Sequence, residues 1–222
     1  MQIVVTGAGT ELGQELLRAI IARAVLARAD GTPAPVQRIL GVDRVQPATL
    51  FVDDRIEYVR GDYEQPRFLA RMMGASTNSV FHLSARDAGF GVDADADGLE
   101  LALMRSFDTT RALVDVCRCQ AYPPRVVFAG LRDLRSAADA APSSTDAFCV
   151  DICESLLIES ARRGLIDLRS VRLPGTHGAP ALVRNPAGAA EALLQAHEWP
   201  GTDAPVRILQ LDDGGKLGPV GA

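Results

Sequence analysis

Short apolar runs alternate with longer stretches of helical periodicity along most of the chain. The apolar runs have the length of buried strands, and they occupy residues 2–6, 38–43, 56–62, 79–83, 125–129 and 169–173. Helical spacing of apolar residues follows the first run and recurs at 66–73, 99–120 and 146–163. This alternation predicts an α/β fold, a Rossmann-type doubly wound parallel sheet with helices on both faces and right-handed crossovers.

The pattern becomes sparser after residue 175. One helical pattern at 186–197 and one apolar run at 206–211 remain. We therefore expect a Rossmann domain over residues 1–175, followed by a vestigial C-terminal lobe and tail over residues 176–222. The glycine-rich stretch 212–219 is expected to be loose.

A glycine-rich turn follows the first predicted strand. Thr6 is followed by Gly7, Ala8 and Gly9, and Gly13 lies in the helix that begins there. Glycines let the backbone turn sharply and approach a pyrophosphate, whose charge then meets the amides at the helix N-terminus. The residues of this turn assigned to cofactor contact are Gly7, Gly9, Thr10, Glu11, Leu12 and Gly13.

An acidic residue, Asp43, ends the apolar run 38–43. A carboxylate at this place can accept hydrogen bonds from both ribose hydroxyls of an adenosine, and it repels a 2′-phosphate. Asp43 therefore favours NAD as the cofactor, whereas Arg44 beside it keeps NADP as the alternative. Glycines alone also suit a turn that serves only strand-to-helix packing. The strand, the helix and the distal acid together predict an NAD(P)-binding site.

Composition and charge narrow the class of partner. The 222 residues are 47% hydrophobic and 23% charged, which suffices for one well-buried core. The net charge of -5 argues against nucleic acid or an anionic membrane surface as the main partner. No apolar stretch approaches the ~20 residues that cross a bilayer, and no leader pattern opens the chain, so we expect a cytoplasmic protein with a small-molecule ligand.

The four cysteines lack the spacing and the neighbouring histidines of a metal site. We therefore expect free thiols and no bound metal. They are Cys117, Cys119, Cys149 and Cys153.

Several segments together resemble the extended short-chain dehydrogenase/reductase superfamily, in its NAD-dependent epimerase/dehydratase branch. These segments are 6–13, 61–62, 81–85, 125–128 and 171–174. Residues 161–167 and 172–174 are similar to the D-erythronate dehydrogenases of that branch. The vestigial C-terminal part falls where the family has the lobe that binds substrate.

The resemblance implies further contacts with the cofactor. Asp62 is expected beside the adenine, and Leu83, Ser84 and Ala85 along the ribose and phosphates. Thr10 departs from the family, which usually has glycine there, and it places a side chain next to the diphosphate. The resemblance also implies that the helices at 99–120 and 146–163 pair across a two-fold axis to form a homodimer.

The oxidoreductases of this family use a tyrosine as general acid/base, a lysine four residues later that lowers its pKa, and a serine after the fifth strand. This chain has no Tyr-x-x-x-Lys sequence. Leu131 occupies the place of the serine, and the one lysine is Lys216 in the tail. All tyrosines precede the helix that carries the pair in the family, and they are Tyr58, Tyr63 and Tyr122.

Alignment of Glu154 with the acid usually found on that helix puts Asp146 in the tyrosine's place and Val150 in the lysine's. Other alignments offer Ala147 with Asp151, or Phe148 with Ile152. None of these alignments restores the proton relay.

The first interpretation is an enzyme that performs a non-redox acid/base reaction, such as an elimination, isomerisation or cyclisation, on a small metabolite. Its candidate residues follow the carboxyl ends of strands, where open parallel sheets bind ligands. They are His177, Asp146, Arg86, Asp87 and Arg132. A carboxylate near an arginine and a histidine can transfer protons and hold an anionic substrate. The alternatives are a helix cap for Asp146 and solvated charges for the arginine–aspartate pairs.

Two other interpretations use the same cofactor site. In one, the chain is a catalytically inactive NAD-binding sensor or partner module. In the other, it is an unconventional NAD-dependent dehydrogenase or epimerase in which Asp146 or His177 supplies the proton transfer.

Overall fold

A computed structural model describes residues 1–44, 49–61, 66–73, 77–83, 96–131, 145–174, 185–200 and 205–220. The strands of its main sheet are β1 (Gln2–Thr6), β4 (Arg38–Asp43), β5 (Ile56–Arg60), β6 (Thr77–His82), β7 (Arg125–Leu131), β8 (Asp167–Leu173), β9 (Val206–Leu211) and β10 (Leu217–Pro219). The helices are α1 (Glu11–Arg23), α2 (Pro66–Met73), α3 (Ala96–Cys117), α4 (Thr145–Arg162) and α5 (Pro186–Glu198). A separate two-stranded sheet pairs β2 (Val25–Ala27) with β3 (Pro33–Pro35).

The main sheet has the strand order β10-β9-β8-β7-β6-β1-β4-β5, and its strands are parallel except β10. The chain leaves β1 toward β4 and β5 and then returns to β6 on the other side of β1. This reversal makes the carboxyl ends of β1 and β6 a topological switch point, the place where such sheets bind ligands. Thr6 and His82 are register partners there.

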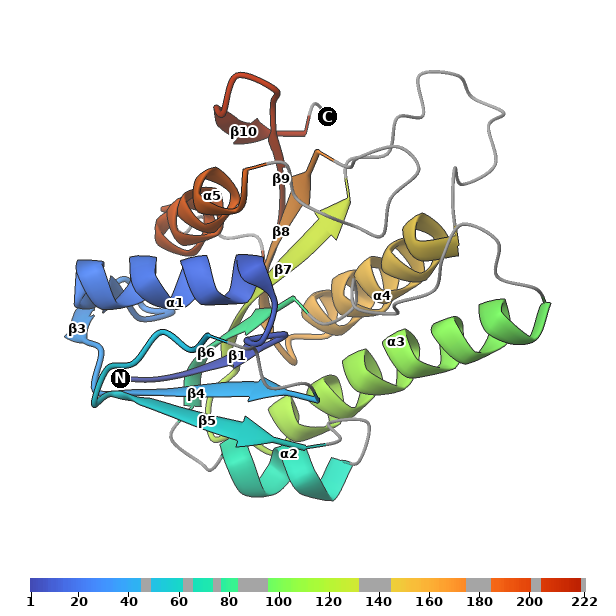
Figure 1. Cartoon of the computed structure of the whole chain (residues 1–222), viewed down its shortest axis with the longest axis horizontal. Helices are drawn as coiled ribbons and strands as arrows, with labels where there is room; N and C mark the ends of the chain where they lie inside the picture. Colours follow the sequence, from blue (N-terminus) through green and yellow to red (C-terminus); the bar gives the residue numbers. More distant parts are fainter. Residues whose placement is uncertain are drawn as a thin grey trace.

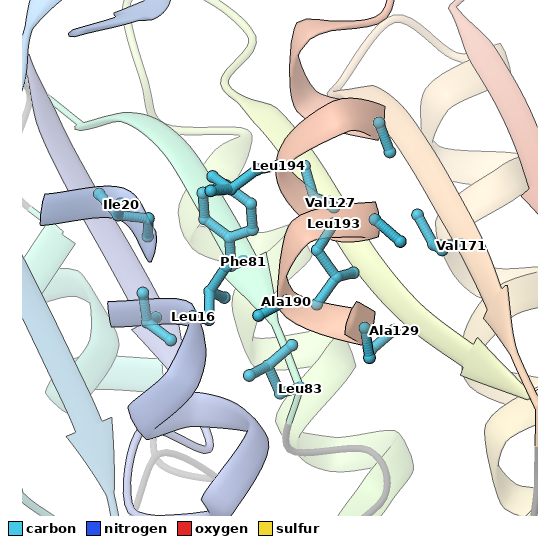
Figure 2. Close-up of a cluster of buried hydrophobic side chains, with 14 of the residues drawn as sticks. Leu16, Ile20, Phe81, Leu83, Val127, Ala129, Val171, Ala190, Leu193 and Leu194 are labelled. Carbon is cyan, nitrogen blue, oxygen red and sulfur yellow. The ribbon is translucent and has the colours of Figure 1, made fainter. Parts of the chain in front are cut away.

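Helices cover both faces of the sheet (Figure 1). α1 and α5 pack together on one face, while α2, α3 and α4 lie on the other. Figure 2 shows side chains of α1 and α5 meeting the strand residues that point to their side. The labelled members are Leu16, Ile20, Phe81, Leu83, Val127, Ala129, Val171, Ala190, Leu193 and Leu194. Burial on both faces explains why the strands β1, β4 and β7 are almost continuously apolar between their ends.

These observations confirm the predicted fold class. The predicted helices 99–120 and 146–163 lie three and one residues earlier, as α3 and α4. β9 and β10 extend the main sheet, and α5 packs beside α1. The division of the chain at residue 175 stays a prediction.

The prediction of a loose tail at 212–219 is wrong. After a turn at Gly215, where φ is 80°, β10 pairs antiparallel with β9. Asp212 accepts a hydrogen bond from the Lys216 amide at 2.7 Å within that turn. Gly215 therefore supplies the left-handed backbone that a tight hairpin needs, and the stretch is not a loose tail.

Gly13 allows α1 to lie against the turn that precedes it. A Cβ at Gly13 would lie 2.3 Å from the Gly7 carbonyl oxygen and 2.8 Å from the Ala8 Cα. Both neighbours are backbone atoms, so they cannot rotate away as a side chain can. The first turn of α1 therefore reaches the end of β1 only when residue 13 has no side chain.

We predict that Gly13→Ala lowers the free energy of unfolding by about 1–3 kcal/mol, because the methyl group overpacks this contact. Urea unfolding of the two proteins measures the difference. Gly218→Ala is the matched control, since a Cβ at Gly218 meets nothing within 4 Å and its change should stay within about 0.5 kcal/mol. Equal stability of Gly13→Ala and the unmodified protein would contradict the close approach.

Candidate functional site

The turn between β1 and α1 is tied to β4 by its backbone. The amides of Gly7 and Ala8 donate to the Val42 carbonyl at 3.0 and 3.3 Å. Gly7 has a φ of 74°, a left-handed conformation that glycine adopts without strain. The turn therefore has the sharp bend that the sequence predicted, at the switch point of the sheet.

Thr10 is the N-cap of α1. Its hydroxyl donates to the Gly7 carbonyl at 2.7 Å and accepts from the Gly13 amide at 3.0 Å. Both bonds hold the side chain against its own turn. Thr10 thus replaces the family's glycine with a residue that closes the turn onto the helix. Its effect on a diphosphate stays a prediction.

The next two residues of α1 differ in exposure. Glu11 is exposed in the first helical turn, where a carboxylate interacts favourably with the helix dipole. Leu12 is buried in the core shared by α1 and α5. Because the side chain of Leu12 is buried, only the backbone of Leu12 can contact a ligand.

Asp43 meets the glycine turn directly. One of its carboxylate oxygens, Oδ2, accepts a hydrogen bond from the Gly9 amide at 2.6 Å. Its backbone carbonyl accepts from Gly61 at 3.0 Å, and the Arg44 carbonyl accepts from Arg60 Nε at 3.1 Å. The structure thus brings together the predicted glycine turn and the predicted acid, and it places the carboxylate beside the N-terminus of α1.

A buried histidine lies below this turn at the switch point. His82 Nδ1 lies 2.8 Å from Thr6 Oγ1, and Nε2 lies 3.0 Å from Thr110 Oγ1. The Thr110 hydroxyl donates to the Ser106 carbonyl at 2.9 Å, so it must accept from Nε2–H of the histidine. Nδ1 then accepts from Thr6. Burial lowers the pKa of His82 to about 3, so the ring is neutral.

From the sequence we did not expect that His82 links β1, β6 and α3. Its position at the end of an apolar strand, beside Thr6 in the expected register, could have indicated this. Leu83, the next residue, was predicted as a cofactor contact. Its amide donates to the Thr6 carbonyl at 3.2 Å, and its side chain packs into the core beneath α5 (Figure 2).

Most predicted acid/base residues lie outside the described residues, as do three of the cofactor contacts. These residues are Arg86, Asp87, Arg132, His177, Asp62, Ser84 and Ala85. Asp146 lies in the first turn of α4, which begins at Thr145, and its side chain is not described.

In the alignment fixed by Glu154, the place of the family's lysine is apolar. Val150 is buried on α4 among the core residues Cys153 and Leu157. Glu154, one turn further along, is buried as well, and Arg172 Nη2 donates to its carboxylate at 2.7 Å. Ser170 donates to the same carboxylate. This acid is therefore held in an ion pair that joins α4 to β8.

The described tyrosines lie far from the lysine. Lys216 precedes β10 at one edge of the main sheet, and Tyr58 lies on β5 at the other edge, roughly 30 Å away at about 4.8 Å per strand. Tyr122 is exposed before β7, near the amino ends of the strands. Within the described ranges, no tyrosine is paired with a lysine.

The remaining predictions concern the cysteines, a membrane span, a metal site and the dimer contact. The four cysteines are free, as predicted. None of the described helices is long and apolar enough to cross a membrane, and no cluster suited to a metal ion occurs in the described part of the chain. α3 and α4 carry the exposed apolar residues Leu101, Met104 and Phe148 on the elements of the expected dimer contact, and the homodimer stays a prediction.

Comparison with known proteins gave relatives in sequence and in structure, although no family model matches the chain. The D-erythronate dehydrogenase of Cupriavidus necator is 33% identical over 183 residues, which cover 78% of this chain and 55% of that protein. The nucleoside-diphosphate-sugar epimerase of Agrobacterium tumefaciens matches with a TM-score of 0.64 and 26% identity, over 86% of this chain and 57% of that one.

The dTDP-glucose 4,6-dehydratase DesIV of Streptomyces venezuelae, solved with NAD bound, matches with a TM-score of 0.69. The match covers 95% of this chain and 75% of that one at 17% identity, and it shows a shared fold. The chain spans about half the length of the curated relatives that it matches.

The neutral state of His82 predicts a pH dependence of stability. Its pKa is about 3 in the fold, against an ordinary value of 6.5, so the unfolded chain takes up a proton below pH 6.5 that the folded protein does not. Stability is therefore full above pH 6.5 and falls toward pH 3, by up to about 1.4 kcal/mol per pH unit. Urea unfolding across this range measures the slope.

His82→Gln isolates this contribution, because a glutamine keeps an N–H for Thr110 and does not titrate. Burial also lowers the pKa of His197, which adds a slope of the same sign to both proteins. We expect the variant to be less stable at neutral pH and to lose stability less steeply on acidification. Parallel slopes for the two proteins would show that His82 takes up a proton in the fold as readily as in the unfolded chain, and would contradict the lowered pKa.

Proposed function

Because the chain belongs to the extended epimerase/dehydratase branch of the short-chain dehydrogenase/reductase superfamily, we propose that it binds NAD at the turn between β1 and α1. On that scaffold it catalyses a non-redox acid/base reaction, an elimination, isomerisation or cyclisation, on a small metabolite. The observation that carries the cofactor assignment is the 2.6 Å hydrogen bond from the Gly9 amide to the Asp43 carboxylate.

The residues present fit a dinucleotide. The positive φ of Gly7 and the close approach at Gly13 bring the first amides of α1 to the carboxyl edge of the sheet, where they can face a diphosphate. Asp43 borders the same turn and can accept hydrogen bonds from an adenosine ribose. Its charge opposes a 2′-phosphate, which favours NAD over NADP.

The choice of a non-redox reaction rests on the proton relay. NAD supplies a nicotinamide ring that accepts a hydride, but an alcohol that gives up a hydride must also lose its hydroxyl proton. In the alignment fixed by Glu154, a buried valine, Val150, occupies the lysine's place, and the other alignments put Asp151 or Ile152 there. Glu154 itself is already paired with Arg172. Asp146, His177 and the charged residues Arg86, Asp87 and Arg132 remain as the groups proposed to move protons or hold an anionic substrate.

A second candidate function is an NAD-dependent dehydrogenase with an unconventional base. The relative with 33% identity is named a D-erythronate dehydrogenase, and this favours the same class of substrate, a small hydroxy acid. Asp146 or His177 would then accept the hydroxyl proton as the hydride leaves. The two candidates share the cofactor site and differ in whether bound NAD becomes reduced.

We predict that Asp43→Asn raises the Kd for NAD by about 10- to 100-fold, because the ribose hydroxyls lose hydrogen bonds to a charged acceptor. Isothermal titration calorimetry measures both constants. The preference for NAD over NADP should shrink in the same variant, since the charge that opposes the 2′-phosphate is gone.

Asp108→Asn is the matched control. Asp108 pairs with Arg111 at 3.3 Å on α3, which lies on the face of the sheet opposite α1, so this variant should bind NAD like the unmodified protein. Unchanged affinity in Asp43→Asn would place the nucleotide site elsewhere, and absence of binding by the unmodified protein would refute the cofactor assignment.

A further inference from the structure

One buried polar side chain of α1 takes no part in the helix cap or in the contact with Asp43. The rest of the buried face of α1 is mainly apolar, but Gln14 is only 6% exposed. A buried amide is costly unless its donors and acceptor are paired. Its partners therefore indicate what the residue does.

Gln14 links two backbone segments that are far apart in the sequence. Its Nε2 donates to the Ala8 carbonyl at 2.7 Å, and its Oε1 accepts from the Phe51 amide at 2.7 Å. A carbonyl can only accept and an amide can only donate, so these two partners fix the orientation of the Gln14 amide.

Tyr58 completes the arrangement from β5. Its hydroxyl donates to the Phe51 carbonyl at 2.7 Å and lies 3.3 Å from Gln14 Nε2, from which it can accept. Burial raises the pKa of Tyr58, so the phenol keeps its proton at neutral pH. Both backbone polar groups of Phe51 are thus bonded to side chains. We call Ala8, Gln14, Phe51 and Tyr58 the Gln14 bracket.

The Gln14 bracket is continuous with the candidate nucleotide site. Ala8 lies between Gly7, which bends the turn, and Gly9, whose amide donates to Asp43. Phe51 belongs to the segment 49–55, which follows Asp43 in the chain and leads into β5. The side chain of Gln14 is therefore hydrogen-bonded both to the glycine turn and to the segment 49–55.

We propose that Gln14 is a positioning residue for the adenosine half of NAD, acting through Ala8 and Phe51 without touching the ligand. The inference rests on the proposed NAD binding. Loss of the Gln14 amide leaves the Ala8 carbonyl and the Phe51 amide without this partner. The turn is then free to shift relative to Asp43, and the affinity for any ligand held by both is reduced.

The test is Gln14→Met, which keeps the length of the side chain and removes both hydrogen bonds. We expect the Kd for NAD to rise about tenfold, which corresponds to the loss of a buried hydrogen-bonded contact. ADP-ribose, which has the adenosine half and lacks the nicotinamide, should lose affinity by the same factor. Calorimetry at a temperature where both proteins are folded measures the two ligands.

Two variants provide the controls. Tyr58→Phe removes the bond to the Phe51 carbonyl and the longer contact with Gln14, but it keeps the Gln14 bonds to Ala8 and Phe51. It should therefore weaken both ligands less than Gln14→Met does, and the double variant should show coupling between the two sites. If Gln14→Met does not fold, Tyr58→Phe carries the test. Gln195→Met, at an exposed glutamine on α5, should bind both ligands normally.

Hydrogen exchange gives a readout that needs no ligand. The Phe51 amide should be protected in the unmodified protein and in Gln195→Met, and it should exchange faster in Gln14→Met. A merely structural role would lower the stability of Gln14→Met and leave the Kd of the folded protein unchanged.

The outcomes separate the inference from the proposed function. Unchanged Kd values in Gln14→Met, while the unmodified protein binds NAD, overturn the positioning role and leave the cofactor site standing. A rapidly exchanging Phe51 amide in the unmodified protein overturns the Gln14 bracket itself. Failure of the unmodified protein to bind NAD overturns both.

Discussion

The backbone contact between α1 and the end of β1 is the constraint on which the candidate site depends. α1 can lie there because Gly13 offers no Cβ to the Gly7 carbonyl, and Gly7 can bend the chain because its φ is positive. The Thr10 cap and the Asp43–Gly9 hydrogen bond both use atoms that this approach brings within reach. A helix displaced by the width of a methyl group would separate the turn from the acid that borders it.

The buried polar groups near the site link elements of the fold, and their surroundings do not suit proton transfer. His82 is held neutral between two threonines and joins β1, β6 and α3. Glu154 is paired with Arg172 and joins α4 to β8. Neither group has the exposed, adjustable proton that a general acid or base requires. The family's scaffold is thus retained around the nucleotide turn, while the helix that should carry the redox pair presents Val150 to the core.

The elements with regular apolar periodicity could be predicted from the sequence, and those that depend on distant partners could not. The buried strands and the turn from Gly7 to Gly13 are local patterns, so they were found. The hairpin of β2 and β3 contains Pro33 and Pro35, which argue against a strand, and β10 follows glycines that resemble a loose tail. Gln14 resembles a surface residue of a helix, because its partners Phe51 and Tyr58 lie on segments that only the folded chain brings to it.

We propose that this chain holds NAD without a redox relay. The most direct test saturates the purified protein with NAD, adds an excess of D-erythronate and related hydroxy acids, and follows the absorbance band of reduced nicotinamide. We expect NAD to bind and the band not to grow, not even by the amount that a single turnover of each protein molecule would give. Reduction of NAD at a rate typical of enzymes would contradict it and favour the dehydrogenase.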